Sequence, residues 1–323
     1  MFSSVLDRLS WRYFNTLGLW LLLMVCLIGQ PLQADAASRV SIVVGSPSML
    51  SNEFVEQFRT ELKLQGVNGL EVNLLKLEEL PKYRPKSASD ELLLAVGVQA
   101  LAEISQLKLD VPVLGVFVPQ ISYDAILADH PRSAGKISAV LLDQPFSRQL
   151  ALLKTILPDV QKVGVLYGQT SQQFSGSLHR ASRLLGLELV EAEVGQEKDV
   201  MSALKQVLDE SRVLLAVPDA SVYSRETAQT ILLTTYRYQT PVIGFSQAYV
   251  RAGALAAVYS SPRQIARQVA EIVLMQNGSL PAPAYPKYFS IDINRQVARS
   301  LGITLNSEHE LSEALYRIER QSP

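Results

Sequence analysis

The sequence contains very few of the side chains that build metal and redox centres. Its 323 residues include a single cysteine and three histidines, namely Cys26, His130, His179 and His309. These residues do not combine with aspartate or glutamate at the spacings that are typical of a metal site. No Gly-x-Gly-x-x-Gly segment follows any of the apolar runs, which gives nucleotide binding little support. We therefore expect neither a metal nor a cofactor.

A large excess of charge of either sign is also absent. Lysine and arginine together number 30 against 31 aspartate and glutamate residues, so the formal net charge is −1. The sequence has no long run of like charge and no low-complexity segment. This balance does not indicate a nucleic-acid partner or binding to an anionic membrane surface. With 48% hydrophobic and 19% charged residues, the chain is typical of a globular α/β protein, and it is long enough for two domains.

The N-terminal apolar run is too short for a comfortable membrane span. Residues 17–28 form a run of about a dozen residues, whereas a spanning helix needs roughly twenty. Arg8 and Arg12 precede this run, and small residues follow it at 34–37. The pattern predicts a cleaved secretory signal peptide at 1–37 and a periplasmic location for the mature protein. The alternative is an uncleaved membrane anchor.

Cys26 lies inside this predicted leader. Cleavage near Ala36 or Ala37 leaves a mature chain without cysteine, and such a chain is indifferent to an oxidising compartment. The alternative for Cys26 is lipid attachment. Val25 stands where a small residue is normally needed, and the apolar run continues past the cysteine. The sequence therefore favours cleavage over a lipid anchor.

After residue 38, short apolar runs alternate with segments of helical periodicity. This alternation predicts parallel strands joined by crossover helices. We expect strands at Val40–Gly45, Val72–Leu77, Leu92–Val96, Val111–Val118, Ile137–Leu141, Lys162–Gly168, Leu187–Glu193, Val213–Val217, Pro241–Gly244, Ala254–Tyr259 and Tyr288–Ile293. After Pro145 the order of strand, polar loop, helix and glycine starts again. The predicted fold class is α/β, with two Rossmann-like lobes that have parallel sheets and are joined by a hinge.

The chain must cross between two such lobes, and the crossing segments are hinge candidates. We expect crossings at Leu141–Gln144, at Tyr259–Ser261 and at Pro281–Pro286. Modest dihedral changes at strand ends are sufficient for lobe closure. The individual hinge candidates are Leu141, Asp143, Gln144 and Ser260.

Polar and aromatic side chains follow the strands of the second lobe, where ligands bind in sheets of this kind. They are Asp219, Ser221, Tyr223, Ser246 and Tyr249. They resemble a recognition surface for a small polar solute. Asp219 is the expected partner of a ligand ammonium group; the alternative is a turn residue, because Pro-Asp-Ala-Ser suits a turn equally well. Tyr223, Tyr249 and Phe117 offer ring faces to a ligand, or they are ordinary core aromatics.

A zwitterionic solute also needs hydrogen-bond donors for its carboxylate. Helix N-termini supply such donors without a formal cation. The candidates at junctions between strands and helices are Ser46, Ser48, Gly97, Gln99, Gln169 and Ser171. The alternative is that the serines and threonines at these junctions are simple N-caps that satisfy the N–H groups of their own helices.

One segment superficially resembles the nucleophile elbow of hydrolases. It reads Gly244-Phe245-Ser246-Gln247-Ala248, and it lacks the second glycine of that motif. The histidines lie in poor contexts for a triad base, because His130 falls in an expected loop and His309 follows the expected fold. We therefore do not expect an enzyme.

Several short motifs taken together resemble those of one protein family. They are Leu141–Pro145, Gly164–Gly168, Val217–Asp219, Ile243–Ser246, Val250–Ala256, Tyr259–Pro262 and Asn294–Gly302. In this order and spacing, the set resembles the ABC-transporter substrate-binding family, whose better-known members capture aromatic amino acids such as tryptophan and tyrosine. The resemblance covers most of the chain after the leader and is densest from Leu141 to Gly302.

The resemblance implies a type I periplasmic-binding-protein fold, with three crossings and a ligand in the cleft between two lobes. It also implies that Ala256–Tyr259 crosses back to the first lobe and that the Pro262–Gln276 helix belongs there. The first lobe then comprises 38–142 plus about 260–283, and the second comprises 143–259 plus about 284–323.

Two loops depart from the family pattern. Val118-Pro119-Gln120 stands where many relatives carry an Asp-Pro dipeptide, and Gly168–Ser171 replaces a loop that is often rich in asparagine. Both loops face the cleft in the family, so the ligand need not be an aromatic amino acid. We expect an exported, monomeric protein that captures a small polar, amino-acid-like solute and delivers it to an ABC permease. The alternative is a periplasmic sensory or adaptor module for a signalling receptor.

Overall fold

The computed structural model describes residues 39–67, 69–85, 91–107, 109–131, 135–275 and 279–321. The predicted signal peptide, including Cys26, lies outside the described residues. No helix in the described part is long and apolar enough to cross a membrane.

The first half of the described chain forms a five-stranded parallel sheet with the order β2-β1-β3-β4-β5. The strands are β1 Arg39–Val44, β2 Glu71–Lys76, β3 Glu91–Val96, β4 Val113–Val118 and β5 Ile137–Leu141. The central strands β3 and β4 are buried along their whole length, because a parallel sheet of this type is covered on both faces. β4 starts two residues later than the predicted Val111, since Pro112 has no N–H to donate to a neighbouring strand.

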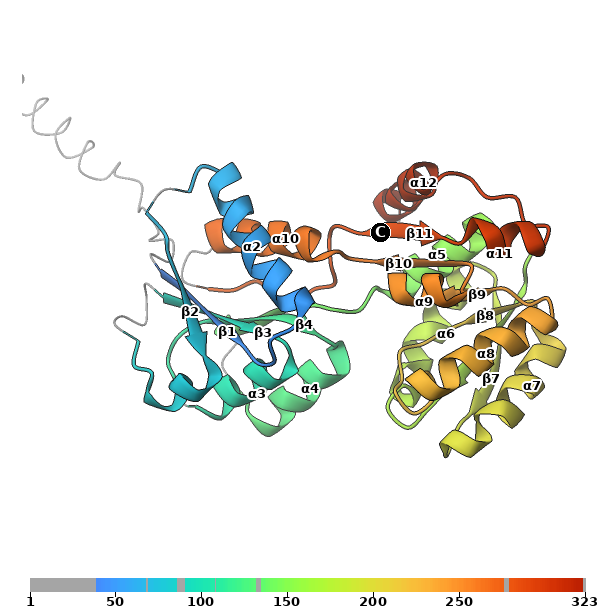
Figure 1. Ribbon diagram of the computed structural model, residues 1–323, viewed down its shortest axis with the longest axis horizontal. Helices are drawn as coiled ribbons and strands as arrows, with labels where there is room; N and C mark the ends of the chain where they lie inside the picture. Colours follow the sequence, from blue (N-terminus) through green and yellow to red (C-terminus); the bar gives the residue numbers. More distant parts are fainter. Residues whose placement is uncertain are drawn as a thin grey trace, which may run out of the picture. The chain divides into compact units, whose positions relative to one another are not determined.

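Helices cover both faces of this first sheet (Figure 1). On one face, α2 Met49–Leu64 packs against α10 Pro262–Met275, which comes from much later in the sequence. On the other face lie α3 Val98–Gln106, α4 Gln120–Asp129 and the 3-10 turn η1 Leu77–Lys82. The apolar side chains of α10 share one buried cluster with those of α2 and β1.

The second sheet has six strands in the order β11-β10-β9-β8-β6-β7. They are β6 Lys162–Tyr167, β7 Glu188–Glu193, β8 Val213–Leu215, β9 Val242–Gly244, β10 Ala256–Tyr259 and β11 Ser290–Ile293. Five strands are parallel, whereas β11 pairs antiparallel with β10. The parallel prediction therefore holds for the first sheet and for five strands of the second, and it fails only at this edge, because the helix α10 between β10 and β11 packs on the first sheet instead of crossing over the second.

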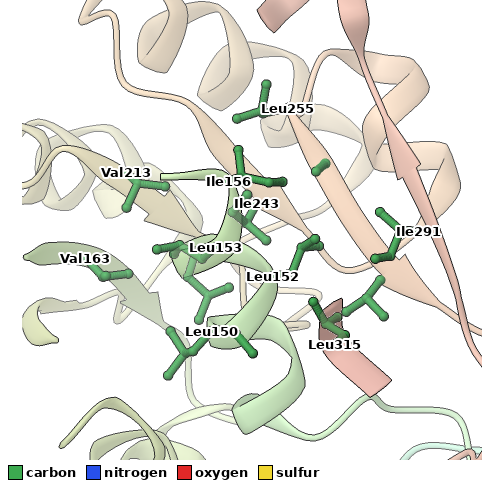
Figure 2. Close-up of a cluster of buried hydrophobic side chains, with 14 of the residues drawn as sticks. Leu150, Leu152, Leu153, Ile156, Val163, Val213, Ile243, Leu255, Ile291 and Leu315 are labelled. Atoms are coloured by element: carbon green, nitrogen blue, oxygen red, sulfur yellow. The ribbon is translucent and has the colours of Figure 1, made fainter. Parts of the chain in front are cut away.

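Both faces of the second sheet are also covered by helices. One face carries α5 Phe146–Ile156, α6 Ser175–Leu184, α11 Arg295–Ser300 and α12 Glu308–Gln321, with the 3-10 turn η2 Gln172–Phe174. The other face carries α7 Val200–Glu210, α8 Arg225–Arg237 and α9 Gln247–Ala252, with η3 Glu197–Asp199. Figure 2 shows how Leu150 and Leu153 of α5 lie among strand residues such as Val163, with Leu315 of α12 closing the cluster.

The two sheets repeat one topology. Without the added β11, the second sheet reads β7-β6-β8-β9-β10, which has the same order as β2-β1-β3-β4-β5 in the first. This repetition confirms the predicted fold class of two Rossmann-like α/β lobes. Helix α4 was not predicted, because its apolar residues do not form one stripe and only Tyr123 is buried.

Candidate functional site

In each sheet the strand order reverses at one point. Chain order runs outward from β1 to β2 on one side and from β3 to β5 on the other, so the switch point lies between β1 and β3. The equivalent point in the second sheet lies between β6 and β8. In open α/β sheets, ligands bind at such switch points, beyond the carboxyl ends of the strands. Most of the sequence-predicted ligand residues follow these strands.

At the first switch point, the loop after β1 meets the loop after β3. Ser46 Oγ donates a 3.0 Å hydrogen bond to Oε1 of Gln99, and both side chains are exposed. Gly45 makes this approach possible, since a Cβ at this position would lie only 2.8 Å from the backbone nitrogen of Ala100. Gly97 has a φ of 92°, a conformation that favours glycine. The structure therefore brings Ser46, Gly97 and Gln99 together at one edge.

Ser48 has a capping role. Its Oγ accepts a hydrogen bond from the backbone nitrogen of Ser51 at 3.1 Å, and Ser51 Oγ accepts one from the backbone nitrogen of Ser48 at 2.8 Å. This reciprocal capping box begins α2. Of the two interpretations of Ser48, the geometry supports the N-cap.

At the second switch point, the carboxylate of Asp219 joins the loop after β6 to the loop after β8. Its Oδ2 accepts hydrogen bonds from Thr170 Oγ1 and from the backbone nitrogen of Ser171, both at 2.8 Å. Its Oδ1 accepts two more from Ser221, from the backbone nitrogen at 2.9 Å and from Oγ at 2.7 Å. A carboxylate offers about four acceptor positions, so these donors occupy all of them.

The four donors also determine the charge state of Asp219. Burial by itself raises the pKa of a carboxyl group, but here the hydrogen bonds from Ser221, Thr170 and Ser171 outweigh burial and lower the pKa to about 2. Asp219 is therefore an anion whose charge is stabilised by hydrogen bonds from within the protein. This geometry fits a residue that positions two loops. The contact of Asp219 with a ligand ammonium group stays a prediction.

Gly168 permits the Asp219 contacts in the same way that Gly45 permits those of the first lobe. A Cβ at Gly168 would lie 2.6 Å from Oδ2 of Asp219. The backbone nitrogen of Gly168 donates to Ser171 Oγ at 2.9 Å, so the hydroxyl group of this buried serine is hydrogen-bonded within its own loop. Gln169 and Thr170 remain exposed at the loop surface. Gln169 is thus the predicted residue of this loop that is exposed to solvent.

Three aromatic rings gather near the ends of β8 and β9. Tyr223 lies 6.0 Å from Phe245 and 5.9 Å from Tyr249, measured between ring centroids. Both tyrosines are buried, and their hydroxyl groups have no hydrogen-bond partner within the described part of the chain. Ser246 caps α9 by accepting a hydrogen bond from the backbone nitrogen of Tyr249 at 3.2 Å. Tyr223 and Tyr249 therefore belong to the core cluster under α7 and α8, beside the switch point.

Phe117 also lies in a core. Its ring packs edge-on against Phe54, with centroids 5.4 Å apart, and its φ is 55° at a bulge in β4. The bulge shifts the register, so that Val118 pairs with Leu141. The core interpretation of Phe117 fits this packing better than a ring face offered to a ligand.

The predicted hinge residues lie on the segments that connect the two sheets. The backbone nitrogen of Leu141 donates to the carbonyl oxygen of Ala284 at 2.9 Å. Asp143 Oδ2 accepts a 2.6 Å hydrogen bond from the backbone nitrogen of Gln120 at the start of α4. Burial raises the pKa of Asp143, and the hydrogen bond from Gln120 opposes that rise. Gln144 Nε2 donates to Ser260 Oγ at 2.8 Å, which links the first connection to the second.

Two contributors were not found from the sequence. Arg148 is a buried charged residue on α5, and an arginine at the start of a helix carries no sequence signal for burial. Thr170 fell within the predicted loop but was not singled out, because the sequence around a loop threonine does not reveal a hydrogen-bond acceptor 49 positions away. No cluster of histidine, cysteine, aspartate or glutamate that could hold a metal ion occurs in the described ranges.

Many solved structures share this fold, and three of them illustrate the likeness. A conserved domain protein from Vibrio cholerae is 20% identical, with a TM-score of 0.58 over 86% of this chain and 98% of that chain. An ABC domain from Streptococcus pneumonia in complex with L-Trp is 14% identical, with a TM-score of 0.56 over 85% and 98%. A ligand-free, open substrate-binding protein with adhesive properties from Clostridium difficile is 16% identical, with a TM-score of 0.66 over 83% and 96%.

At such identities the likeness shows the fold, which is that of type I periplasmic binding proteins. A search of curated proteins finds no match. The sequence itself matches the family described as ABC transporter substrate binding protein over residues 84–315, which is well over half of the chain. The match includes the switch-point residues of the second sheet and all three connections between the sheets. The chain therefore belongs to the ABC transporter substrate-binding protein family.

Proposed function

We propose that this protein is exported to the periplasm as a monomer, captures a small polar, amino-acid-like solute between its two lobes and delivers it to an ABC permease. The observation that carries the proposal is the repeated strand order, which gives each lobe a switch point with its own hydrogen-bonding loops. A ligand that contacts both switch points binds the closed arrangement more tightly than the open one, and this difference drives closure.

Neutral groups provide the recognition in this proposal. In the first lobe, Ser46 and Gln99 are exposed and already in contact with each other, which orients both side chains. In the second lobe, Gln169 is exposed on the loop that Asp219 holds. Amide and hydroxyl groups can donate to a ligand carboxylate and accept from a ligand ammonium group. An amino-acid-like solute therefore finds both kinds of partner without a free charged side chain.

Asp219 takes a revised role in this proposal. Its carboxylate holds Thr170, Ser171 and Ser221 in place, so the loops keep one conformation before a ligand arrives. Such pre-organisation raises affinity because less conformational entropy is lost on binding. Replacement of Asp219 then weakens binding through loop disorder, whereas replacement of Gln169 removes a direct contact.

The test is a thermal-shift screen of the purified exported protein against the proteinogenic L-amino acids, followed by calorimetry on each hit. We expect one or a few compounds to raise the melting temperature and to bind with one-to-one stoichiometry. Gln99→Ala and Gln169→Ala should each weaken binding by roughly 2- to 10-fold, the value of one lost hydrogen bond. Gln206→Ala, an exposed residue of α7, is the matched control and should leave affinity unchanged.

The outcomes separate the parts of the proposal. If only a solute of another class binds, the amino-acid-like ligand is wrong and the solute-binding role stands. If Gln99→Ala and Gln169→Ala bind like the unaltered protein, the ligand does not lie at the switch points. A sensor kinase encoded beside this chain, in place of a permease and an ATPase, would favour the signalling module over delivery.

A further inference from the structure

Arg148 is a buried arginine at the start of α5, and its guanidinium group makes contacts in several directions. Its Nη1 donates to Oε1 of Gln144 at 2.6 Å and to the carbonyl oxygen of Pro286 at 2.8 Å. Its Nε donates to Oε1 of Glu319 at 2.5 Å. The guanidinium carbon also lies 4.3 Å from the ring centroid of Phe289. A rigid fork of donors suits this task, since lysine offers only a compact point charge.

Through these contacts, Arg148 reaches all three connections between the sheets. Gln144 lies on the first connection, and its Nε2 donates to Ser260 Oγ on the second at 2.8 Å. Ser260 Oγ donates in turn to the carbonyl oxygen of Tyr288, two residues after the third connection, at 2.6 Å. Pro286, which Arg148 contacts directly, lies on the third connection as well. One continuous network of side chains therefore joins the three segments that a hinge motion must bend.

The two residues that follow the third connection are hydrogen-bonded to α10, which packs in the core of the first sheet. The backbone nitrogen of Lys287 donates to Gln268 Oε1 at 2.7 Å, and Tyr288 Oη donates to Glu271 Oε1 at 2.5 Å. The Arg267 guanidinium lies 4.3 Å from the centroid of the Tyr288 ring. Residues 287–288 are thus tied to α10 on one side and, through Ser260, to the Arg148 network on the other.

Glu319 connects this network to the C-terminal helix α12. The helix is anchored by Leu311 and Leu315, which are fully buried in the core of the second sheet. Tyr316 of α12 stacks on Phe289 with ring centroids 4.3 Å apart, next to the Arg148 contact. A charge buried with a bonded partner is strongly disturbed when that partner is removed. The position of Arg148 therefore depends on α12.

We infer that Arg148 is a positioning residue for the hinge, and that α12, through Glu319, controls how freely the three connections bend. The inference rests on the proposed function only in assuming that the lobes move relative to each other. The Arg295–Glu308 pair at the other end of α12 has no such link, because both side chains are exposed and lie at 2.9 Å from each other on the surface. That pair provides a matched control on the same helix.

The test measures the distance between the lobes directly. Spin labels are attached to Glu53→Cys on α2 and Lys205→Cys on α7, both exposed positions, in the full chain carrying Cys26→Ser. The distance distribution is recorded without ligand by pulsed electron paramagnetic resonance. We expect Glu319→Gln and Arg148→Lys to broaden the distribution and shift its mean, whereas Glu308→Gln leaves it unchanged. Melting temperatures are measured on the same samples.

A lower melting temperature with an unchanged distance distribution in Glu319→Gln and Arg148→Lys overturns the inference, since the network then only packs α12. An equal effect of Glu308→Gln also overturns it. If Arg148→Lys does not fold, Glu319→Gln decides alone, because it removes the carboxylate charge that faces the guanidinium group while it keeps the size of the side chain. If no added amino acid changes the distance distribution, the proposed ligand class is wrong. The comparison of the variants without ligand still tests the inference in that case.

Discussion

Thr170 donates a 2.8 Å hydrogen bond to Asp219, a residue 49 positions later in the sequence. The bond crosses the switch point of the second sheet and ties the loop after β6 to the loop after β8. The first sheet has a counterpart in Ser46 and Gln99, which are 53 positions apart. In each lobe a long-range hydrogen bond therefore spans the switch point, and in each case a preceding glycine leaves room for this contact.

The first prediction concerns Asp219→Asn. The amide nitrogen of asparagine cannot accept the hydrogen bonds that Thr170 and Ser171 donate, so two donors lose their acceptor. We expect the free energy of unfolding to fall by about 1–3 kcal/mol in urea denaturation. Asp209→Asn, at an exposed position of α7, should stay within about 0.5 kcal/mol of the unaltered protein. Equal stability of the two variants would show that the carboxylate of Asp219 does not hold the loops.

The second prediction concerns pH. The pKa of Asp219 is lowered from 3.8 to about 2 by its donors, so the folded state holds this proton less tightly than the unfolded state. The resulting stability is fully present well above pH 3.8 and is lost as the pH falls towards about 2. The stability difference between the unaltered protein and Asp219→Asn should therefore shrink over this window. A difference that stays constant down to about pH 2 contradicts the lowered pKa.

The third prediction compares two glycines. Gly168→Ala places a Cβ 2.6 Å from Oδ2 of Asp219, and we expect it to destabilise the protein by about 1–3 kcal/mol through overpacking. Gly176 lies within α6, where the nearest atom to an added Cβ is the tip of Arg180 at 3.9 Å. Gly176→Ala should instead stabilise the protein by about 0.5–1 kcal/mol, because alanine favours the helix. Chemical denaturation of both variants checks the opposite signs.

The fourth prediction separates capping from ligand contact. Ser48→Ala removes the N-cap of α2 and should cost about 1 kcal/mol of stability. Ser46→Ala removes an exposed hydroxyl and should change stability by no more than about 0.5 kcal/mol. In calorimetry with a solute found in the screen, we expect Ser46→Ala to weaken binding more than Ser48→Ala does. The reverse order would move the site away from Ser46.

The fifth prediction concerns the buried tyrosines. Tyr223→Phe and Tyr249→Phe each remove a buried hydroxyl that has no partner in the described residues, so stability should stay the same or rise. Tyr167→Phe removes a hydroxyl that donates to Glu191 Oε1 at 2.8 Å, and it should cost about 1 kcal/mol. Thermal unfolding of the three variants measures the contrast. A large loss in Tyr223→Phe would reveal a partner, such as a buried water, that satisfies the hydroxyl.

Much of the fold was predictable because it depends on local periodicity. The apolar run Leu92–Val96 of β3 and the stripe of Phe54, Phe58 and Leu62 on α2 identify their elements without any tertiary information. The restart of the pattern after Pro145 predicted a second lobe, and the repeated strand order bears this out. Helix α4 was missed for the same reason, since its apolar residues do not repeat on one face.

The candidate site was predictable only in part. The residues after each strand are recognisable from the sequence, because a parallel sheet brings all its carboxyl ends to one edge. Their partners are not recognisable in this way. Thr170 and Ser171 donate to Asp219 from a segment far from it in the chain. Pro286 and Glu319 likewise accept from Arg148 across a long stretch of sequence. The sequence therefore placed Asp219 directly after β8 and left open whether it contacts a ligand or forms a turn, whereas only the structure shows that both of its carboxylate oxygens are hydrogen-bonded within the protein.

By itself, the sequence determined the two α/β lobes, the order of their elements and the residues that follow each strand, because spacing along the chain is enough to specify these features. Only the tertiary structure decided which polar groups at those edges are free and which are bonded to each other. The physical reason is that a hydrogen bond is made within about 3 Å, and folding alone brings residues such as Thr170 and Asp219 to that distance.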